Sequence, residues 1–385
     1  MQRTIIVVGG GPAGLSFARS LAGSPHRVII VDPASRETLS APPQDGREIA
    51  MTRRTQAILT EMGVWERFPE GQVHPLCQAR VLNGSSPFAM HFGPEQGDAL
   101  GHLVSNHLIR GALFAAVEHQ PNVEFHLGRR VVKPLATETG VSAVLDDGTE
   151  LVGDLLIAAD SRFSQMRDAL GIDASVTRTG HTMMVCRISH SAPHRHTSTE
   201  WFDHGRTIAL LPLQEGQSGL VVTVPDAEAK ALCALDDKAL ERRMAGFLGN
   251  RWGEIALLNR PIPYPLAMTY AARFSGPRCA LIGDTAVGMH PVTAHGFNFG
   301  LLGAWRLGKL VAQASDPGAT HLLKRYARQH RLATLPLYEA TRQLVKLYTD
   351  DRLLARPVRA GVLRLGALPP VRRIMGRLLS EARAA

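Results

Sequence analysis

The sequence predicts an α/β protein with two subdomains and a helical C-terminal region. Its 385 residues exceed the ~250–300 residues at which a single hydrophobic core usually stops growing. The first 32 residues alternate strand, glycine-rich turn, helix and strand, which is typical of a βαβ unit. Residues 181–224 instead favour antiparallel strands, and the last ~70 residues favour helices.

The N-terminal unit carries a dinucleotide-binding motif. The apolar run "TIIVV" predicts a buried strand, and Pro12 suits the first position of a helix. Between them Gly9, Gly11 and Gly14 form GxGxxG, whose glycines permit a tight turn, pyrophosphate approach and close helix packing. The second strand, "RVIIVD", ends at Asp32, where an acid can accept hydrogen bonds from a ribose. This context predicts a Rossmann-like domain rather than an incidental glycine turn.

The remaining elements follow from periodicity and turn residues. Apolar residues at helical spacing predict three further helices, at 55–68, 105–119 and 236–249. Alternating apolar residues, with turn signals such as Asp147-Gly148, predict strands within 76–92, 123–128, 141–160 and 181–224. A buried strand returns at 278–284.

Composition indicates an ordinary globular protein. Hydrophobic residues make up 45% and charged residues 20%, and no run approaches the ~18–20 apolar residues of a membrane span. The apolar N-terminal run leads directly into the glycine motif without a cleavage site, so we expect no signal peptide and a cytoplasmic location. Four scattered cysteines predict buried thiols rather than disulfides or a metal site.

The stretch "GDTAVGMHPVTAHGFNFG", residues 283–300, is the second unusual segment. A strand delivers Asp284, Pro291 fixes a loop, and a helix begins near Gly296. The apolar face of this helix is small: it comprises Phe297, Leu301, Ala304, Gly308 and Val311. Its first turn offers unpaired N–H groups and partial positive charge, which suit an anionic edge of a bound cofactor.

Together these motifs resemble a known family. GxGxxG, Asp160-Ser161 followed by Arg167, and Gly283-Asp284 make the chain similar to single-component FAD-dependent aromatic hydroxylases of the p-hydroxybenzoate hydroxylase-like fold. Segments such as "DGREIAMTRRTQAILTEMGVW" and "LVSNHLIRGAL" resemble the ring hydroxylases of ubiquinone biosynthesis. The 283–300 stretch most resembles their UbiM-type, 5-demethoxyubiquinol hydroxylase branch, and the match runs nearly end to end.

The resemblance implies an FAD site spread along the chain. The GxGxxG turn and Asp32 would hold adenosine and pyrophosphate, Arg47 would lie by the flavin, and Asp160 and Asp284 would bracket pyrophosphate and ribityl. The residues expected to bind FAD are Gly9, Gly11, Pro12, Ala13, Gly14, Asp32, Arg47, His107, Asp160, Gly283, Asp284, Pro291, Gly296, Phe297 and Asn298.

Three departures from the family pattern bear on these roles. The relatives usually have glycine where Ser161 stands, a turn associated with nicotinamide docking, and often arginine where His107 stands. They commonly read GDAAH, whereas the fifth residue here is Val287. Their AGQG is replaced by Thr293, Ala294, His295 and Gly296.

The implied reaction transfers oxygen to an electron-rich phenol through a flavin C4a-hydroperoxide, with NADH or NADPH and O2 as co-substrates. No second GxGxxG follows a strand, so we expect no separate nicotinamide domain; transient docking of the nicotinamide is what the resemblance implies. An apolar pocket must exclude water, and Leu210, Leu211, Pro212 and Val221 are the expected lining. The candidate catalytic residues are His290, His295 and Pro291, with either histidine as base or hydrogen-bond acceptor for a phenol of pKa ~10, or as a structural group.

We expect three regions. The FAD-binding domain comprises residues 1–75, 98–174 and 277–330, and the substrate domain comprises 76–97 and 175–276. Residues 331–385 form a helical region that is basic at its end. Eight arginines and one acid, Glu381, follow residue 351 and account for +7 of the net charge of +9.

This tail predicts a partner surface. Val371, Ile374, Met375 and Leu378 recur at helical spacing between arginines, which favours either peripheral contact with the inner face of the cytoplasmic membrane or packing on the body. A partner in a ubiquinone-biosynthesis complex is a further interpretation. Nucleic acid is disfavoured because the basic residues are not interleaved with aromatics.

The sequence is compatible with four hypotheses about function. The favoured one is hydroxylation of a prenylated phenol or quinone precursor in ubiquinone biosynthesis. The others are hydroxylation of another small aromatic, a flavin-dependent prenyl reductase or halogenase, and a non-catalytic FAD- or lipid-binding protein. A halogenase is disfavoured because the chain lacks WxWxIP.

Overall fold

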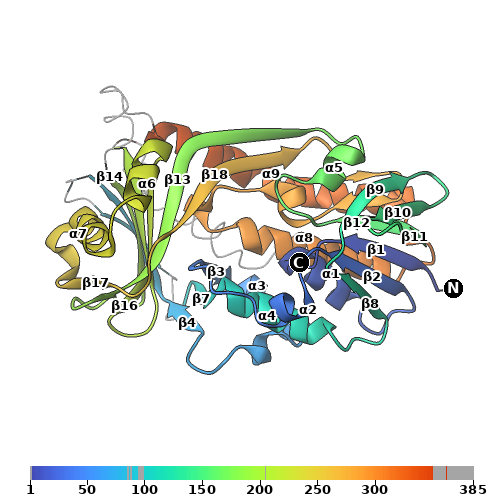
Figure 1. Cartoon of the computed structure of the whole chain (residues 1–385), viewed down its shortest axis with the longest axis horizontal. Coiled ribbons are helices and arrows are strands. Elements are labelled where there is room, and N and C mark those ends of the chain that lie inside the picture. Colours follow the sequence, from blue (N-terminus) through green and yellow to red (C-terminus); the bar gives the residue numbers. More distant parts are fainter. Residues whose placement is uncertain are drawn as a thin grey trace.

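The computed structural model describes residues 2–84, 86, 89–93, 99–203, 205–349 and 361. A six-stranded sheet lies at one end of the molecule, a nine-stranded sheet lies at the other, and helix α8 runs between them (Figure 1). The helices are α1 (Pro12–Ser20), α2 (Arg36–Ser40), α3 (Arg53–Glu61), α4 (Asn106–Val117), α5 (Gln165–Ala169), α6 (Asp226–Cys233), α7 (Asp237–Leu248), α8 (Gly296–Ala312) and α9 (Thr320–Thr349).

The six-stranded sheet is parallel except at its β19 edge. Its central strands are buried and almost wholly aliphatic, as strands covered on both faces must be. In sheet order the strands are β19 (Ser275–Gly276), β20 (Cys279–Leu281), β12 (Leu155–Ala158), β1 (Thr4–Val8), β2 (Arg27–Asp32) and β8 (Val123–Leu127).

Helices and a small sheet enclose this core. Helix α1 packs against α4 and α8. The small sheet packs against β1 and β12, and comprises β11 (Glu150–Gly153), β10 (Val141–Leu145) and β9 (Val131–Ala136). A side chain at Gly308 of α8 would place its Cβ 2.4 Å from the Cβ of Ser20 of α1. Gly308, in the apolar face predicted for α8, therefore lets the two helices approach this closely.

The nine-stranded sheet is mostly antiparallel. Along its main path the strands are β21 (Val287–Gly288), β18 (Ile262–Ala271), β13 (Ala174–His190), β16 (Gln217–Pro225), β15 (Arg206–Pro212), β14 (Thr197–Asp203), β5 (Gln78–Asn83) and β6 (Ala89–Phe92). The ninth strand, β17 (Ile255–Leu257), pairs with β13.

The two faces of this sheet have different neighbours because side chains alternate along each strand. The outer face packs under α6 and α7, and includes Met184, Cys186, Ile208, Leu210, Leu220 and Val222. The inner face includes Met183, Val185, Val221 and Tyr264, and it turns toward the six-stranded sheet. Gly46, which lies shortly before residue 48, contacts Val185 on this face. The inner face is therefore the wall on which a substrate site can form.

A buried ion pair joins the two halves of the molecule. Glu48 of β3 (Glu48–Thr52) accepts hydrogen bonds from Arg187 of β13 at 2.8 and 2.9 Å. Ser105 of β7 (Gly101–Ser105) bonds both partners. Strands β3 and β7 form a second small sheet with β4 (His74–Leu76). Because Glu48 is almost fully buried, the pair holds the sheets in a fixed relation.

The predicted fold class is confirmed. The expected strand at residues 4–8 and the helices starting near 12 and 296 are present. The helix predicted at 55–68 ends earlier, at Glu61, because Gly63 adopts a φ of +64°. Residues 78–83 and 89–92 join the nine-stranded sheet, and α9 crosses residue 330 without a break. The division into three regions stays a proposal.

Candidate active site

Three turns meet at the carboxyl edge of the six-stranded sheet. They follow β1, β12 and β20, which are parallel neighbours and therefore end on the same side. Gly9 has a φ of +116°, and a Cβ there would lie 2.4 Å from the carbonyl oxygen of Ala159. A Cβ on Gly283 would lie 2.7 Å from the Cβ of Ala13. Only glycine permits both approaches, so these two positions bring the three turns together.

The GxGxxG turn leaves room for a phosphate. A Cβ on Gly14 would lie 1.9 Å from the Gly9 carbonyl oxygen, so the start of α1 packs tightly on the turn. Gly11, in contrast, has no atom within 4 Å of the position that its Cβ would take. Helix α1 begins there with Pro12 and without an acidic residue in its first turn. An open, electropositive helix start of this kind fits the pyrophosphate of FAD.

Asp32 fixes the turn from the end of β2. Its carboxylate accepts hydrogen bonds from the backbone N–H groups of Gly10, at 2.6 Å, and Ala34, at 2.8 Å. The side chain is half-buried and carboxylate oxygens have further lone pairs, so the predicted contact with a ribose remains available to it.

The other two predicted acids have protein partners. Asp160 accepts from the Ser164 hydroxyl and from the backbone N–H of Met166, at 3.1 Å, at the start of α5. Asp284 pairs with Arg162 at 2.8 Å. The Thr285 hydroxyl donates to the Ser161 carbonyl at 3.1 Å, which ties the two turns together. The contacts of Asp160 and Asp284 with FAD stay predictions.

Arg47 lies in a cluster of polar side chains that was not predicted from the sequence. It pairs with Asp45 at 2.6 Å and stacks 5.3 Å from the ring centre of Tyr264. Asn106 donates to the same Asp45 carboxylate at 2.7 Å. The nearby His107 has a pKa lowered by burial and by Arg187. In the sequence, Asp45 lies two residues before Arg47, and Asn106 lies directly before His107. Tyr264 comes from β18, and the sequence alone could not place it beside them.

The start of α8 is held by Asn298. Its amide donates to the carbonyls of Ala50 and Ala294, both at 2.9 Å, and its oxygen accepts from Thr52 N–H and the Thr55 hydroxyl. These four bonds use the full capacity of the side chain. The amide thus fixes α8 against β3, and any flavin contact at Asn298 would come from its backbone.

Around that helix start the surface is open. Pro291 and Ala294 are exposed, Phe297 is half-buried, and no atom lies within 4 Å of where a Cβ of Gly296 would be. Helix α8 has neither a side-chain cap nor an acid in its first turn. The unpaired N–H groups therefore remain free to face the anionic edge of a flavin.

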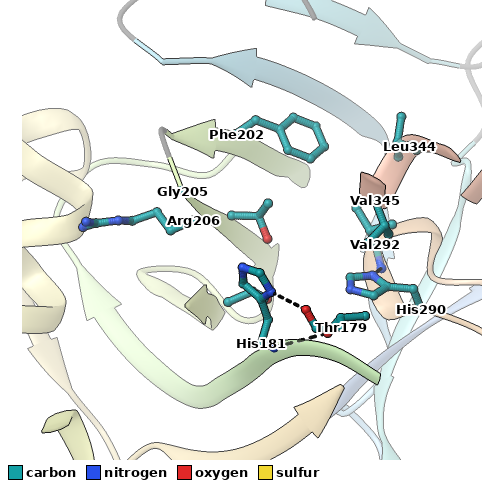
Figure 2. Close-up of a pocket in the computed structure, with 11 residues that line it drawn as sticks. Thr179, His181, Phe202, Gly205, Arg206, His290, Val292, Leu344 and Val345 are labelled. Carbon is teal, nitrogen blue, oxygen red and sulfur yellow. Dashed lines mark hydrogen bonds between the residues drawn. The ribbon is translucent and has the colours of Figure 1, made fainter. Parts of the chain in front are cut away.

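A pocket adjoins this region, between the inner face and the chain around 290 (Figure 2). Its apolar side chains include Phe202, Val292, Leu344 and Val345. His181 and His290 point into it from opposite walls, and Thr179 lies between them.

The two predicted base candidates differ in position. His290 lines the pocket, and its pKa is lowered to about 4 by burial and by the nearby His181 and Arg162. Its Nδ1 accepts the Val292 N–H at 3.3 Å. His295 is 3% exposed, donates from Nδ1 to the Thr293 carbonyl, and does not line this pocket. A neutral His290 bonded in this way presents N–H to the pocket, which is opposite to the acceptor role predicted for it.

The predicted substrate residues do not share one surface. Val221 lies on the inner face, as expected for a lining residue. Leu210 is 1% exposed within the outer cluster under α6 and α7, and Pro212, two residues along the same strand, points the same way. The pleat turns Leu210 and Pro212 away from this pocket, and their contact with substrate stays a prediction. Leu211, which lies between them, faces inward against Gly219.

Glu200 is a further inner-face residue that sequence reasoning missed. It is in register with Ala209 and shares its face with Phe202, whose side chain lines the pocket. Burial raises its pKa to about 8. Alternation along "TSTEWFD" places Glu200 and Phe202 on one face of a strand. Only the pairing of β14 showed that this face is the inner, covered one.

The fold and site define a flavoprotein. The cradle, which consists of the three turns after β1, β12 and β20, faces the inner face of the nine-stranded sheet. The chain belongs to the FAD binding domain family, whose model matches residues 2–338. It is 42% identical to "Ubiquinone hydroxylase UbiM" of Neisseria meningitidis serogroup C / serotype 2a, over 99% of this chain and 85% of that protein. It is 30% identical to "Ubiquinone hydroxylase UbiL" of Rhodospirillum rubrum, over 97% and 88% of the two chains.

A solved structure supports the fold. The p-nitrophenol 4-monooxygenase PnpA from Pseudomonas putida DLL-E4 superimposes with a TM-score of 0.78 and 17% identity, over 99% of this chain and 100% of that one. Membership of the family confirms the predicted FAD-dependent monooxygenase class and its cofactor. The open positions at Gly11 and Gly296 fit that cofactor.

The Ser161 turn predicts a stabilising substitution. Ser161 is exposed with a φ of +105°, a region that costs a side-chain-bearing residue on the order of 1–3 kcal/mol. Ser161→Gly should therefore raise the free energy of unfolding by about 1 kcal/mol, after the greater flexibility of glycine in the unfolded chain is subtracted. Urea denaturation measures the change. Ser161→Ala keeps the strain and is the matched control; equal stability of the two variants would contradict the prediction.

Glu200 predicts a pH-dependent stability. Its carboxyl ionises near 4.5 when unfolded and near 8 when folded, so the folded state binds more protons between these values and stability falls as pH rises. Glu200→Gln removes this loss. The variant should match the wild type near pH 4 and gain on the order of 3 kcal/mol by pH 8 in urea denaturation. The exposed Glu254→Gln is the control. A gain independent of pH would show that Glu200 does not hold its proton.

Proposed function

We propose that the enzyme hydroxylates the aromatic ring of a prenylated phenol or quinone precursor in ubiquinone biosynthesis, with NADH or NADPH and O2 as co-substrates. The observation that carries this proposal is the similarity to the ubiquinone hydroxylases UbiM and UbiL, which extends over nearly the whole chain at 42% and 30% identity. The pocket at the inner face adds independent support from chemistry.

The pocket suits an amphipathic aromatic molecule. Phe202, Leu344 and Val345 come from the nine-stranded sheet and α9, and they offer an apolar wall to a prenyl chain. His181 and His290 offer polar atoms to the oxygens of a ring. Binding a ring at the polar end and its chain along the apolar wall would displace water from both.

The chain's own groups prepare the reaction site. FAD, when bound, supplies the activation of O2 and accepts reducing equivalents from NADH or NADPH. Gly11 and the start of α1 would hold its pyrophosphate, and Arg47 and the first turn of α8 would lie at its ring. The apolar inner face would keep water away from the reacting atoms.

The proposal is tested with FAD-loaded protein, 2-geranylphenol and oxygen-18 gas. The phenol should accelerate NADH or NADPH oxidation, and one labelled oxygen atom should enter its ring. Gly11→Val is the matched variant: the backbone there is extended, with a φ of −78°, so a side chain is tolerated but fills the open phosphate space. It should fold while losing at least about tenfold in FAD affinity, or ~1.4 kcal/mol, by fluorescence titration.

Other products would decide for other functions. Saturation of the prenyl chain without label would identify a prenyl reductase, and halide incorporation would identify a halogenase. Flavin that NADH and NADPH never reduce would identify a non-catalytic binder. Labelled product from simple phenols only would move the substrate to another small aromatic.

We further propose that the enzyme contacts the membrane peripherally, or a biosynthetic complex there, through its basic tail. The amphipathic segment at 371–378 lies outside the described residues. Among the residues that the structure does describe, no helix combines the length and apolar character that a membrane crossing requires. A lipid-soluble substrate is the reason to expect contact at the interface.

The tail predicts binding to anionic vesicles. Full-length protein should sediment with phosphatidylglycerol-containing vesicles and not with phosphatidylcholine alone, because each arginine contributes about 1 kcal/mol near an anionic surface. Replacing Arg372, Arg373 and Arg377 by Gln should weaken binding by about 3 kcal/mol, and salt should do the same. Sedimentation with neither lipid composition would instead favour packing of the segment on the body.

A further inference from the structure

A bulge in β13 directs His181 into the pocket. The pairing of β13 with β18 shifts register between Arg178 and Thr182, and Gly180 adopts a φ of +70° within the shift. The Thr179 hydroxyl accepts the His181 backbone N–H at 3.3 Å. Bulges of this kind re-aim a side chain beside active sites. His290 reaches the same pocket from the opposite wall, directly before Pro291 (Figure 2).

Backbone bonds fix which nitrogen of each ring carries hydrogen. The Nδ1 of His181 lies 2.9 Å from the Thr179 carbonyl oxygen, which can only accept, so Nδ1 is the donor and neutral His181 has its lone pair on Nε2. The Nδ1 of His290 accepts the Val292 N–H, so neutral His290 carries its hydrogen on Nε2. The lowered pKa of His290, about 4, keeps that ring neutral. One acceptor and one donor therefore serve the same pocket.

We propose that His181 Nε2 accepts the phenolic proton of the bound substrate and that His290 Nε2–H donates a hydrogen bond to a second oxygen on the same ring. This inference rests on the proposed function, and it names the ring chemistry that the site selects: a phenol with a neighbouring ether or carbonyl oxygen.

The proton step involves one bond broken and one formed. The phenolic O–H bond breaks, an N–H bond forms at His181 Nε2, and the products are a phenolate and an imidazolium. The Thr179 carbonyl, already bonded to Nδ1–H, stabilises the cation. No electron transfer accompanies this step. Phenolate is the more electron-rich ring, and His181 can return its proton after the ring has been hydroxylated.

The remaining polar groups of the pocket are less suited to these roles. The Arg206 guanidinium stacks on Phe247 of α7, 4.6 Å from the ring centre, and points away from the two histidines (Figure 2). The hydroxyls of Thr207 and Thr223 can bond an oxygen but cannot take a proton at neutral pH. Phe202 and Val292 add only apolar surface.

Asparagine and glutamine separate the two ends of each imidazole, because the Asn amide occupies the Nδ1 position and the Gln amide occupies the Nε2 position. His181→Asn keeps the bond to Thr179 and loses the pocket acceptor, whereas His181→Gln keeps an acceptor that cannot take a proton. We expect kcat to fall by about 10²–10³-fold in both variants, with KM raised only in His181→Asn. His290→Asn keeps the Val292 bond. With 2-geranyl-6-methoxyphenol, which carries a second ring oxygen, this variant should raise KM about tenfold with a smaller change in kcat, and with 2-geranylphenol it should leave KM near the wild-type value.

Binding to the FAD-loaded protein gives a readout that does not depend on turnover. Wild-type protein should bind 2-geranylphenol about tenfold more tightly than its methyl ether, 2-geranylanisole, by calorimetry. In His181→Asn that preference should vanish, while His181→Gln should keep it. The exposed His321→Asn, with the wild-type preference, is the control for the substitution itself.

Two results would overturn the inference in different ways. If His181→Asn keeps both the preference for the phenol and the wild-type kcat, His181 is not the proton acceptor, and the proposed function still stands. If wild-type protein binds neither ligand, the proposed substrate class is wrong, and the inference falls with it. Melting temperatures equal to the wild type within a few degrees confirm that the variants are folded.

Discussion

The site depends on backbone segments that touch where side chains normally keep them apart. Gly9 lies against the carbonyl of Ala159, the start of α1 lies against Gly9, and Gly283 lies against Ala13. With a Cβ at any of these points, the strands could still pair, but the turns beyond them could not converge. The phosphate space at Gly11 and the open start of α8 exist because the surrounding contacts are so close. The absence of side chains at a few positions thus brings three distant segments of the chain together.

The second constraint is the pleat of the nine-stranded sheet. It assigns Leu210 to a core under α6 and α7, and Val221 and Glu200 to the wall that faces the flavin side. The Glu48–Arg187 pair then fixes how far that wall stands from the cradle. An isolated charge at either position would be costly, so the pair binds the two layers to one geometry. The position of the pocket follows from this geometry and not from any single motif.

The sequence was sufficient for the parts that rest on local physics. The GxGxxG turn, the strand to Asp32 and the helix at Gly296 are set by glycine, proline and apolar runs, and each was found where expected. The lining of the pocket was not predictable, because a one-residue shift in strand register exchanges the two faces. Leu210 and Leu211 are adjacent and chemically alike, and only the pairing of β15 with β16 distinguishes them. His181 was missed because its orientation comes from a bulge.

Residues that cost stability lie near the pocket and the predicted cofactor site. His290 is held neutral by burial, Glu200 is held protonated, and Ser161 and Ala294 adopt positive φ values beside the cofactor cradle. Each costs stability. At His290, the burial that makes a charge costly also strengthens hydrogen bonds, since little water competes for them. Neutral His290 can therefore orient a ring in an apolar pocket by donating a hydrogen bond, without itself introducing a charge. That is the environment in which a phenolic proton is most sensitive to the position of one imidazole nitrogen.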